Sequence, residues 1–325
     1  MDATAAHSSS QGPAGASKPS TEYPGTALIV GAGTVVGRQT ALALLHHGCT
    51  KFILTDSSAT RLDYTSLSLK SQVERLGVYT TILLLPGDLR EHAFVDHVFA
   101  EITRRFGRVD YAINCLDVHA PHPSTGTTTG KTTGAGASFQ GVTVMNGLVG
   151  AKGSNASVGD SSDIGNGEFD LASSAAKGEG SKAGWTAAAE GLKALWEVTR
   201  REIGMMSRQQ VRLRQGYEAR KQRGAIVNLV VGRQDSPIDG SVEDTIANFT
   251  RQDSKDHSVE MLRINAVLTG PLVDPDMPVD VRGQTGSTGR GIGGRLGTVD
   301  EVVDLVLFLC AEKSSFVHGT VFGMK

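Results

Sequence analysis

Residues 28–38 read Leu-Ile-Val-Gly-Ala-Gly-Thr-Val-Val-Gly-Arg, and the organisation of the chain follows from them. The apolar run before the first glycine predicts a buried strand, and the apolar spacing after the last glycine predicts a helix. Gly31, Gly33 and Gly37 therefore occupy a strand-to-helix turn. Glycines in such a turn let the backbone approach a pyrophosphate, next to the N–H groups of the helix N-terminus. The stretch predicts a phosphate-binding turn; the alternative is a tight turn that binds no ligand.

A second strand is predicted at 51–56, and it ends in an acid, Asp56. An acid at the end of the second strand is well placed to hydrogen-bond a ribose diol. The pairing of this acid with the glycine turn favours the dinucleotide interpretation over a turn without a ligand.

Strands and helices continue to alternate along the chain. Further strands are predicted at 79–85, 109–114, 225–231, 261–267 and 320–324, and helices at 60–76, 91–106, 185–223, 241–257 and 299–310. This alternation predicts an α/β fold with a doubly wound parallel sheet of about seven strands.

Two segments have a different composition. Residues 1–24 are rich in Ala, Ser, Gly and Pro, which predicts a disordered N-terminal tail before a domain at 25–325. Residues 119–184 are rich in Gly, Ser and Thr, and a loop of that length predicts a low-complexity, disordered insertion. Residues 126–132 within it imitate a phosphate-binding loop, but the glycines are one residue too close and no strand precedes them.

The composition excludes several classes of protein. The net charge is −2, which gives no reason to expect a nucleic-acid partner, and the basic run at 208–223 is interpreted as a solvated helix face. No apolar run is long enough to span a membrane, and the start of the chain lacks a secretory signal, so a cytoplasmic protein is expected. The three cysteines are far apart and odd in number, which indicates reduced thiols. Cys115, His119 and His122 lack a fourth ligand, so no metal site is expected.

The order of these landmarks resembles the short-chain dehydrogenase/reductase family over residues 25–325, apart from the insertion. The resemblance rests on Val30–Gly37, Asp88-Leu89, Ile226-Val227-Asn228, Arg263–Val267, Gly294–Val302 and Phe316–Gly319. It implies a single-domain, Rossmann-type sheet, a small-molecule substrate and a nicotinamide dinucleotide as cofactor. It also implies a possible homo-oligomer, formed by the helices predicted at 185–223 and 241–257.

By this resemblance, seven residues hold the cofactor: Gly31, Gly33, Gly37, Asp56, Asp88, Leu89 and Asn114. Gly31 and Gly37 line the pyrophosphate turn, Asp88 meets the adenine and Asn114 lies beside the adenine ribose. Asp56 favours NAD(H), because a carboxylate repels a 2′-phosphate, while NADP(H) is not excluded.

The chain departs from the family pattern in its cofactor motifs. Val35 stands where the family has its middle glycine, and a β-branched side chain there crowds the turn. After the fourth strand, Leu116 and Asp117 replace two small residues. These three positions count against dinucleotide binding.

The catalytic positions depart further. The serine position of the family falls on Val231, and its tyrosine and lysine positions fall on Asp239 and Glu243. The chain contains no tyrosine after Tyr217. Carbonyl reduction requires a proton for the developing alkoxide, which the family takes from a tyrosine of lowered pKa. The usual reaction of the family is therefore not expected here.

Two hypotheses of function follow. In the first, the chain is a divergent oxidoreductase that transfers hydride to or from a small organic molecule, such as a secondary metabolite of iminium type. Asp239 would stabilise the cation, or donate a proton beside Glu243. The alternative for these two residues is that they are exposed acids at the start of a helix, where the dipole favours them. In the second hypothesis the chain is a non-redox protein on the same fold, either an isomerase or cyclase or a pseudoenzyme that binds a partner.

Overall fold

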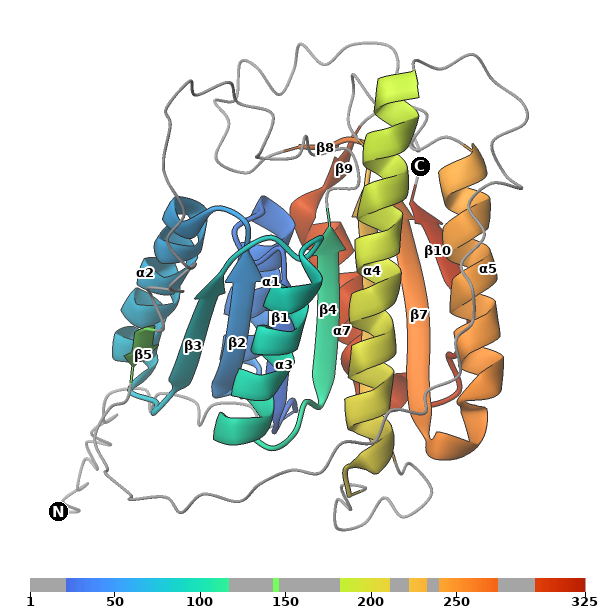
Figure 1. The fold of residues 1–325 in the computed structure, drawn as a ribbon. Helices are drawn as coiled ribbons and strands as arrows, with labels where there is room; N and C mark the ends of the chain where they lie inside the picture. The colour runs from blue at the N-terminus through green and yellow to red at the C-terminus, as the bar shows by residue number, and fades with distance from the viewer. Residues whose placement is uncertain are drawn as a thin grey trace, which may run out of the picture.

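The computed structural model of the chain describes residues 22–116, 143–145, 182–210, 222–232, 240–273 and 296–324. These residues form a sheet with helices on both faces (Figure 1). The strands are β1 (Thr26–Val30), β2 (Lys51–Asp56), β3 (Thr81–Pro86), β4 (Tyr111–Leu116), β5 (Thr143–Met145), β6 (Gly224–Val231), β7 (Leu262–Thr269), β8 (Leu272–Val273), β9 (Gly297–Thr298) and β10 (Val321–Met324). The helices are α1 (Val35–His46), α2 (Ala59–Leu76), α3 (His92–Arg105), α4 (Lys182–Arg208), α5 (Gly240–Asp256) and α7 (Val299–Cys310), with short 3-10 turns at Ser258–Glu260 and Glu312–Ser314.

The main sheet has the strand order β10-β7-β6-β4-β1-β2-β3-β5. Every neighbouring pair is parallel except β3 and β5, which pair antiparallel at the edge of the sheet. This arrangement confirms the predicted α/β fold with a doubly wound parallel sheet. The antiparallel strand β5 was not predicted, because it lies within the segment 119–184, whose composition carries no strand pattern.

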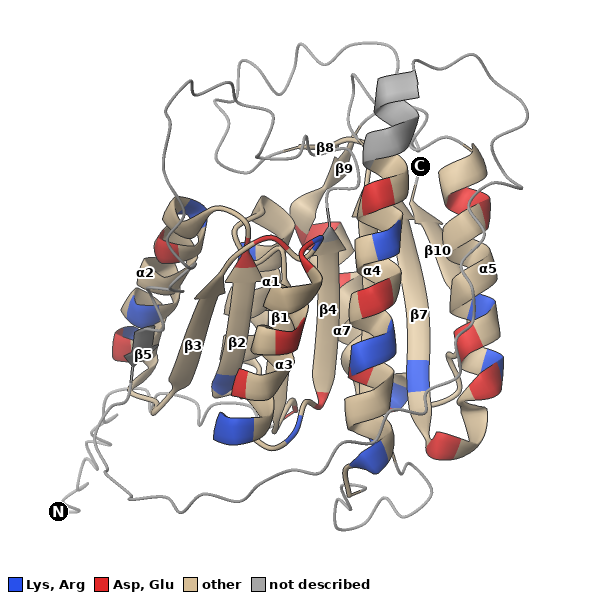
Figure 2. Cartoon of the chain, viewed as in Figure 1, with Lys and Arg blue, Asp and Glu red and all other residues tan. Residues whose placement is uncertain are grey.

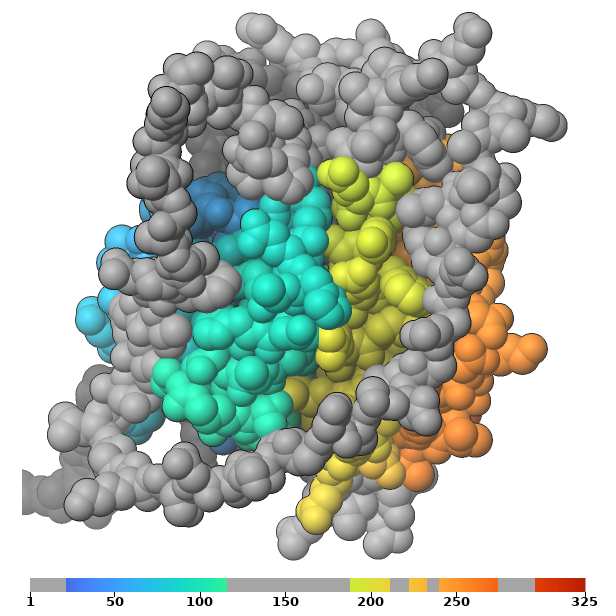
Figure 3. Space-filling model, in the orientation of Figure 1, coloured from blue at the N-terminus to red at the C-terminus, as the bar shows by residue number. Residues whose placement is uncertain are grey.

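The helices divide between the two faces of the sheet according to which side chains each strand presents. Ala27 and Ile29 of β1 enter a core shared with α1, α2 and α7, whereas Leu28 and Val30 enter one shared with α3 and α4. A third cluster joins α4 and α5 to β6 and β7. Figure 3 shows α3 and α4 lying side by side over one face. Period-two alternation in a strand buried on both faces accounts for its unbroken apolar sequence.

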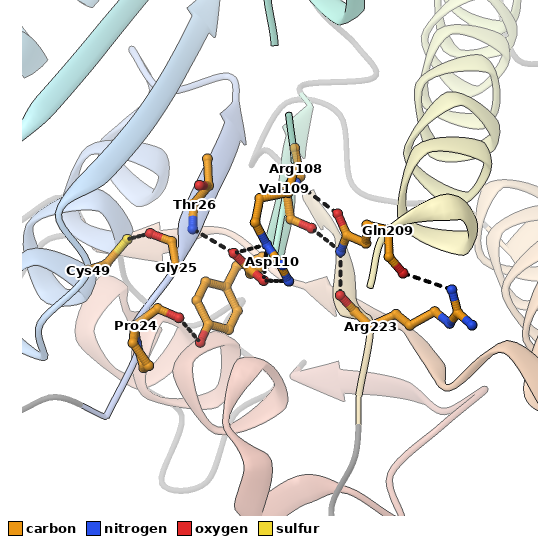
Figure 4. A network of polar contacts seen from close by, with 10 residues as sticks. Pro24, Gly25, Thr26, Cys49, Arg108, Val109, Asp110, Gln209 and Arg223 are labelled. Atoms are coloured by element: carbon orange, nitrogen blue, oxygen red, sulfur yellow. Dashed lines mark hydrogen bonds and ion pairs between the residues drawn. The ribbon is translucent and has the colours of Figure 1, made fainter. Parts of the chain in front are cut away.

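The chain from 185 to 223 is not one continuous helix. α4 ends at Arg208, and β6 begins at Gly224. The Gln209 side chain ends the helix: its Oε1 accepts the Val109 N–H at 3.2 Å, and its Nε2 donates to the carbonyl of Val109 at 2.7 Å and to that of Arg223 (Figure 4). The Gln209 amide thus joins the residues that precede β4 and β6 by hydrogen bonds like those between the two strands. Most of the basic run, 211–221, lies outside the described residues.

The domain begins earlier than position 25. Tyr23, predicted to belong to the tail, is 2% exposed and donates its hydroxyl to the Leu307 carbonyl of α7 at 2.9 Å. Its ring meets those of His47 and Tyr111 edge-on, so it covers the lower end of the core. Burial raises the pKa of this phenol above its ordinary value. Residues 1–21 lie outside the described part of the chain.

Other expectations concern cysteines and membranes. All three cysteines are buried and unpaired, as predicted. Across the described ranges, no helix combines the length and apolar character needed to cross a bilayer.

Arg263, on β7, joins the sheet to the end of α7. Its Nη1 donates to the Leu309 carbonyl at 2.5 Å and to Ser314 Oγ at 2.8 Å, and its Nη2 donates to the carbonyls of Cys310 and Ala311 at 3.2 Å. The last carbonyls of a helix lack partners inside the helix, so one guanidinium supplies donors to several of them. Burial lowers the pKa of Arg263. We interpret Arg263 as the C-terminal cap of α7.

We expect Arg263→Met to lower the free energy of unfolding by roughly 3 kcal/mol, because buried carbonyls at the end of α7 lose their donors. Urea denaturation followed by circular dichroism measures the loss. Arg251→Met is the matched control, since Arg251 is exposed on α5, and it should change stability by less than about 0.5 kcal/mol. Equal losses in the two variants would contradict the capping role.

Candidate functional site

The glycine turn lies at the carboxyl ends of the strands, which point upward in Figure 1. Gly31 follows β1 with φ +69°, and a Cβ on it would lie 1.9 Å from the Cys115 carbonyl oxygen of β4. A Cβ on Gly37 would lie 2.3 Å from the Gly31 carbonyl oxygen. Both positions need glycine because protein backbone occupies the space of a side chain.

Thr34 starts the helix that follows the turn. Its hydroxyl donates to the Gly31 carbonyl at 2.7 Å and accepts the Gly37 N–H at 3.0 Å. The first turn of α1 contains no acidic residue, so the positive end of its dipole has no counter-charge on the helix itself. The N-terminus of α1 therefore suits an anionic group such as a phosphate.

Asp56 ends β2 directly beside this turn and is only 3% exposed. Its Oδ2 accepts the Gly33 N–H at 3.0 Å, and its Oδ1 accepts the Ser58 N–H at 2.8 Å. Gly33 is needed here because a Cβ would lie 2.8 Å from Asp56 Oδ2 and 2.6 Å from Arg61 Cβ. The structure thus brings together Gly33 and Asp56, two predicted site residues.

Arg61 lies at this site but was not predicted from the sequence. Its guanidinium lies 3.1 Å from Asp56 Oδ1, while its side chain remains 55% exposed. The signal for it was its position in the first turn of α2, three residues after the N-cap Ser58 and five residues after Asp56. The Arg61 guanidinium therefore lies beside Asp56, the acid that was predicted to meet a ribose.

Asp88 and Leu89 follow β3 at the same edge. The Gly87 N–H donates to the Asp56 carbonyl at 3.0 Å, so the loop that carries Asp88 is tied to β2. Both oxygens of Asp88 receive Arg90 Nε, at 3.1 and 3.2 Å. Leu89 is 6% exposed and anchors the loop in the apolar core. Figure 2 shows acidic positions at the upper ends of β2 and β3.

Asn114 is placed differently from the glycines and acids. It lies on β4 with no exposure, and its Nδ2 donates at 2.9 Å to Glu202 Oε2 on α4 and at 2.9 Å to Asn228 Oδ1 on β6. The Asn114 amide therefore forms its hydrogen bonds at the interface between α4 and the sheet, below the carboxyl edge of the strands. Glu202 was not predicted as a site residue, although an acid among the apolar positions of α4 is a visible signal in the sequence.

The remaining predicted positions concern catalysis and crowding. Val231 ends β6 and packs on the core, so the side chain at the serine position offers no hydrogen bond. Glu243 lies in the first turn of α5, where the helix dipole favours an acid. Val35 is the first residue of α1 and packs on the same core as α7. Leu116 ends β4, while Asp117 and Asp239 lie outside the described residues.

The described ranges contain no set of side chains that could bind a metal ion. No group of three or more His, Cys, Asp or Glu side chains there is arranged to hold a metal ion. Burial raises the pKa of the Cys115 thiol to about 12, which disfavours the thiolate that a metal or a nucleophilic role requires. His119 and His122 lie outside the described residues.

Tested against a dinucleotide, the two halves of the site differ. The adenosine side fits, because a helix N-terminus without acids, a glycine turn and Asp56 converge at one edge of the sheet. The side where a carbonyl would react does not fit the usual chemistry, because Val231 is apolar.

Part of the chain matches a known protein family. Residues 25–132, which contain the glycine turn, Asp56 and Asp88, match the family model described as short chain dehydrogenase. The solved structure of the citronellol catabolism dehydrogenase AtuB of Pseudomonas aeruginosa PAO1 matches with a TM-score of 0.57 and 19% identity. That match covers 94% of this chain and 98% of that chain, and it shows the shared fold.

Two curated relatives match over part of their length. Cis-4-hydroxycyclohexanecarboxylate dehydrogenase of Sinomonas cyclohexanicum is 33% identical over 110 residues, which are 31% of this chain and 43% of that protein. Inactive 2-(S)-hydroxypropyl-CoM dehydrogenase 2 of Xanthobacter autotrophicus is 28% identical over 116 residues, which are 32% of this chain and 50% of that protein.

This chain thus spans about half the length of the curated relatives that it matches. The matched residues include the glycine turn, Asp56 and Asp88, and the strand order and helix layers continue the same architecture through the rest of the described chain. The family match over residues 25–132, the partial matches to curated relatives and the shared fold make this chain similar to short-chain dehydrogenases.

Proposed function

We propose that the chain binds a nicotinamide dinucleotide at the carboxyl edge of the sheet and is a divergent oxidoreductase that acts on a small organic molecule. The observation that supports this most is the contact of Asp56 with the Gly33 N–H at 3.0 Å, beside the N-terminus of α1. This contact supports the proposal because a carboxylate beside a helix N-terminus suits ribose hydroxyls and a neighbouring phosphate. When bound, the dinucleotide supplies or accepts the hydride.

The chemistry available to the chain's own residues restricts the substrate. With Val231 in place of a hydroxyl, nothing at that position polarises a carbonyl oxygen. An iminium group already carries positive charge. Its carbon accepts hydride to give an amine, and the nitrogen needs no proton in this step. Asp239 and Glu243 are proposed to stabilise such a cation by their negative charge.

Asp56 is the residue whose replacement tests cofactor binding most directly. We expect NADH to bind the wild type and Asp56→Asn to weaken binding roughly tenfold or more, because hydrogen bonds to a charged acceptor contribute about 1.5–3 kcal/mol. Isothermal titration calorimetry measures both affinities. Asp63→Asn removes one exposed acid from neighbouring α2 and should leave the affinity unchanged.

Saturable binding that is equal in the Asp56 and Asp63 variants would remove Asp56 from the site. Absence of binding of either cofactor to the wild type at about 1 mM would overturn the oxidoreductase proposal, because that affinity corresponds to only about 4 kcal/mol. Thermal unfolding of each variant, followed by circular dichroism, separates lost binding from lost folding.

The choice between the two cofactors is proposed to depend on Asp56 and Arg61 together. Asp56 favours NAD(H), while the guanidinium 3.1 Å away offers a partner for a 2′-phosphate. We expect the wild type to bind NADH more tightly than NADPH, and Arg61→Ala to weaken NADPH binding several-fold more than NADH binding. Competition titrations with the two cofactors give both ratios; equal weakening of the two would contradict a role for Arg61 in selectivity.

Asp239 and Glu243 are tested by neutral replacements once a substrate turns over. If their charge stabilises a cationic substrate, Asp239→Asn or Glu243→Gln should lower kcat/KM by roughly tenfold to a thousandfold. Asp244→Asn, an exposed neighbour on α5, is the control. Unchanged turnover in the first two variants would leave them as acids that favour a helix start.

The second candidate is a non-redox protein on the same fold, either an isomerase or cyclase or a binding pseudoenzyme. The apolar Val231 and the absence of any tyrosine after Tyr217 favour it. The name of one relative, an inactive dehydrogenase, shows that the family contains members without activity. Failure of cofactor binding by the wild type would select this candidate. A homo-oligomer that uses α4 and α5 stays a prediction.

A further inference from the structure

A fully buried polar cluster lies between α4 and the sheet, on the face that is otherwise apolar. Asn114 of β4 and Asn228 of β6 are register partners on neighbouring parallel strands, and both have no exposure. Thr199 and Glu202, three positions apart on α4, are equally buried and face them. Thr199 Oγ1 donates to Asn228 Oδ1 at 3.1 Å, so the helix contacts both strands through polar atoms.

Glu202 has few hydrogen bonds for a carboxyl group. Its Oε2 accepts from Asn114 Nδ2 at 2.9 Å. Its Oε1 has no hydrogen-bond partner among the described residues, and neither have Asn114 Oδ1 or Asn228 Nδ2. An ionised carboxylate has about four acceptor sites to satisfy, whereas the neutral acid has fewer. A single donor, Asn114 Nδ2, therefore suits the neutral acid better than the carboxylate.

The charged groups on the elements around α4 are directed elsewhere. On the α3 side, Asp96 and His92 meet Arg201 and Glu197, which are partly exposed. On the α5 side, Asp253 meets Arg200 at 3.3 Å. These pairs lie along the outer sides of α4 and leave Glu202 to the sheet.

The strands beneath Glu202 contribute no charge. β4 and β6 present Asn114 and Asn228, and β7 presents apolar residues on this face, among them Ile264 and Ala266. Burial raises the pKa of Glu202 to about 8, opposed only by the hydrogen bond from Asn114. No described cation takes part in this shift.

We propose that Glu202 carries its proton in the folded protein at neutral pH, and that the docking of α4 on β4 and β6 depends on this proton. A buried charge with one hydrogen bond and no cation is far less stable than the neutral acid. Ionisation therefore opposes the packed interface and favours separation of α4 from the strands. The interface is a pH-sensitive contact in the interior of the fold.

The direction of the pH dependence follows from proton linkage. Unfolded, Glu202 has an ordinary pKa near 4.5, and folded it has a pKa of about 8. Between these values the folded state holds one proton more than the unfolded state. Its contribution to stability is complete below about pH 4.5, falls as the pH rises through this interval, and is lost above about pH 8.

The test compares urea unfolding of the full chain at pH 5, 6, 7 and 8 with that of Glu202→Gln, a neutral side chain of the same shape. The folding equilibrium constant of the wild type, divided by that of the variant, should fall about tenfold per pH unit. Glu190→Gln, an exposed acid on the same helix, is the control, and its ratio should stay constant over this range. A constant ratio for Glu202→Gln as well would overturn the proposal.

A second measurement needs no variant to fold. In wild-type protein labelled with ¹³C at glutamate side-chain carboxyls, one resonance should titrate near pH 8, while exposed glutamates titrate at ordinary values. If every glutamate carboxyl titrates below about pH 6, Glu202 is ionised in the folded protein and the proposal fails. If Glu202→Gln folds, the resonance that titrates near pH 8 should be missing from its spectrum.

Discussion

The close approach of β1 to β4 is the constraint on which the site depends. Where the chain leaves β1, Gly31 adopts φ +69°, and the Cys115 carbonyl of β4 occupies the place of a side chain. Any Cβ there would force apart the two central strands, because backbone atoms cannot yield as a flexible side chain can. α1 begins four residues later and packs on α7, so this contact also sets the position of a whole helix layer.

The two ends of the central strands are stabilised by different means. At the lower end, Gln209 bridges β4 and the start of β6 with its side-chain amide (Figure 4). Nearer the upper end, Asn114, Asn228 and Glu202 form a polar cluster without exposure. Polar side chains in an interior restrict how elements pack, because a displaced helix leaves several groups without partners. The apolar clusters supply most of the burial, and the hydrogen bonds from Asn114 and Thr199 join α4 to β4 and β6.

Most of the fold was predictable from the sequence, and the reasons are local. The strands at Thr26–Val30 and Lys51–Asp56 are apolar runs bounded by turn residues, and the α7 helix was predicted with its bounds from its apolar face. Contacts between distant residues were not predictable. The end of α4 depends on Gln209 reaching Val109, a hundred positions away, and helical propensity continues past it.

The same difference between local signals and contacts made only in the folded chain applies to the site. Gly31 and Asp56, whose contacts in the structure lie at the glycine turn, were predicted as site residues from the spacing of the turn and the strand that follows it. Arg61 and Glu202 were missed, because only the folded chain brings their side chains to Asp56 and Asn114. An acid on an apolar helix face is a signal for burial, but it does not reveal its partner.

The structure also changes what the motif residues mean for function. Gly31 and Gly37 are required by backbone atoms of the protein itself, and Asp56 is held by the Gly33 and Ser58 N–H groups and by Arg61. These residues stabilise the fold whether or not a nucleotide binds, so their presence alone does not distinguish an enzyme from a pseudoenzyme. The N-terminus of α1 is less constrained, since its first turn carries no acid to balance the dipole. A helix N-terminus without an acid in its own first turn, at the edge where Asp56 and the glycines meet, is the observation that favours an anionic ligand most.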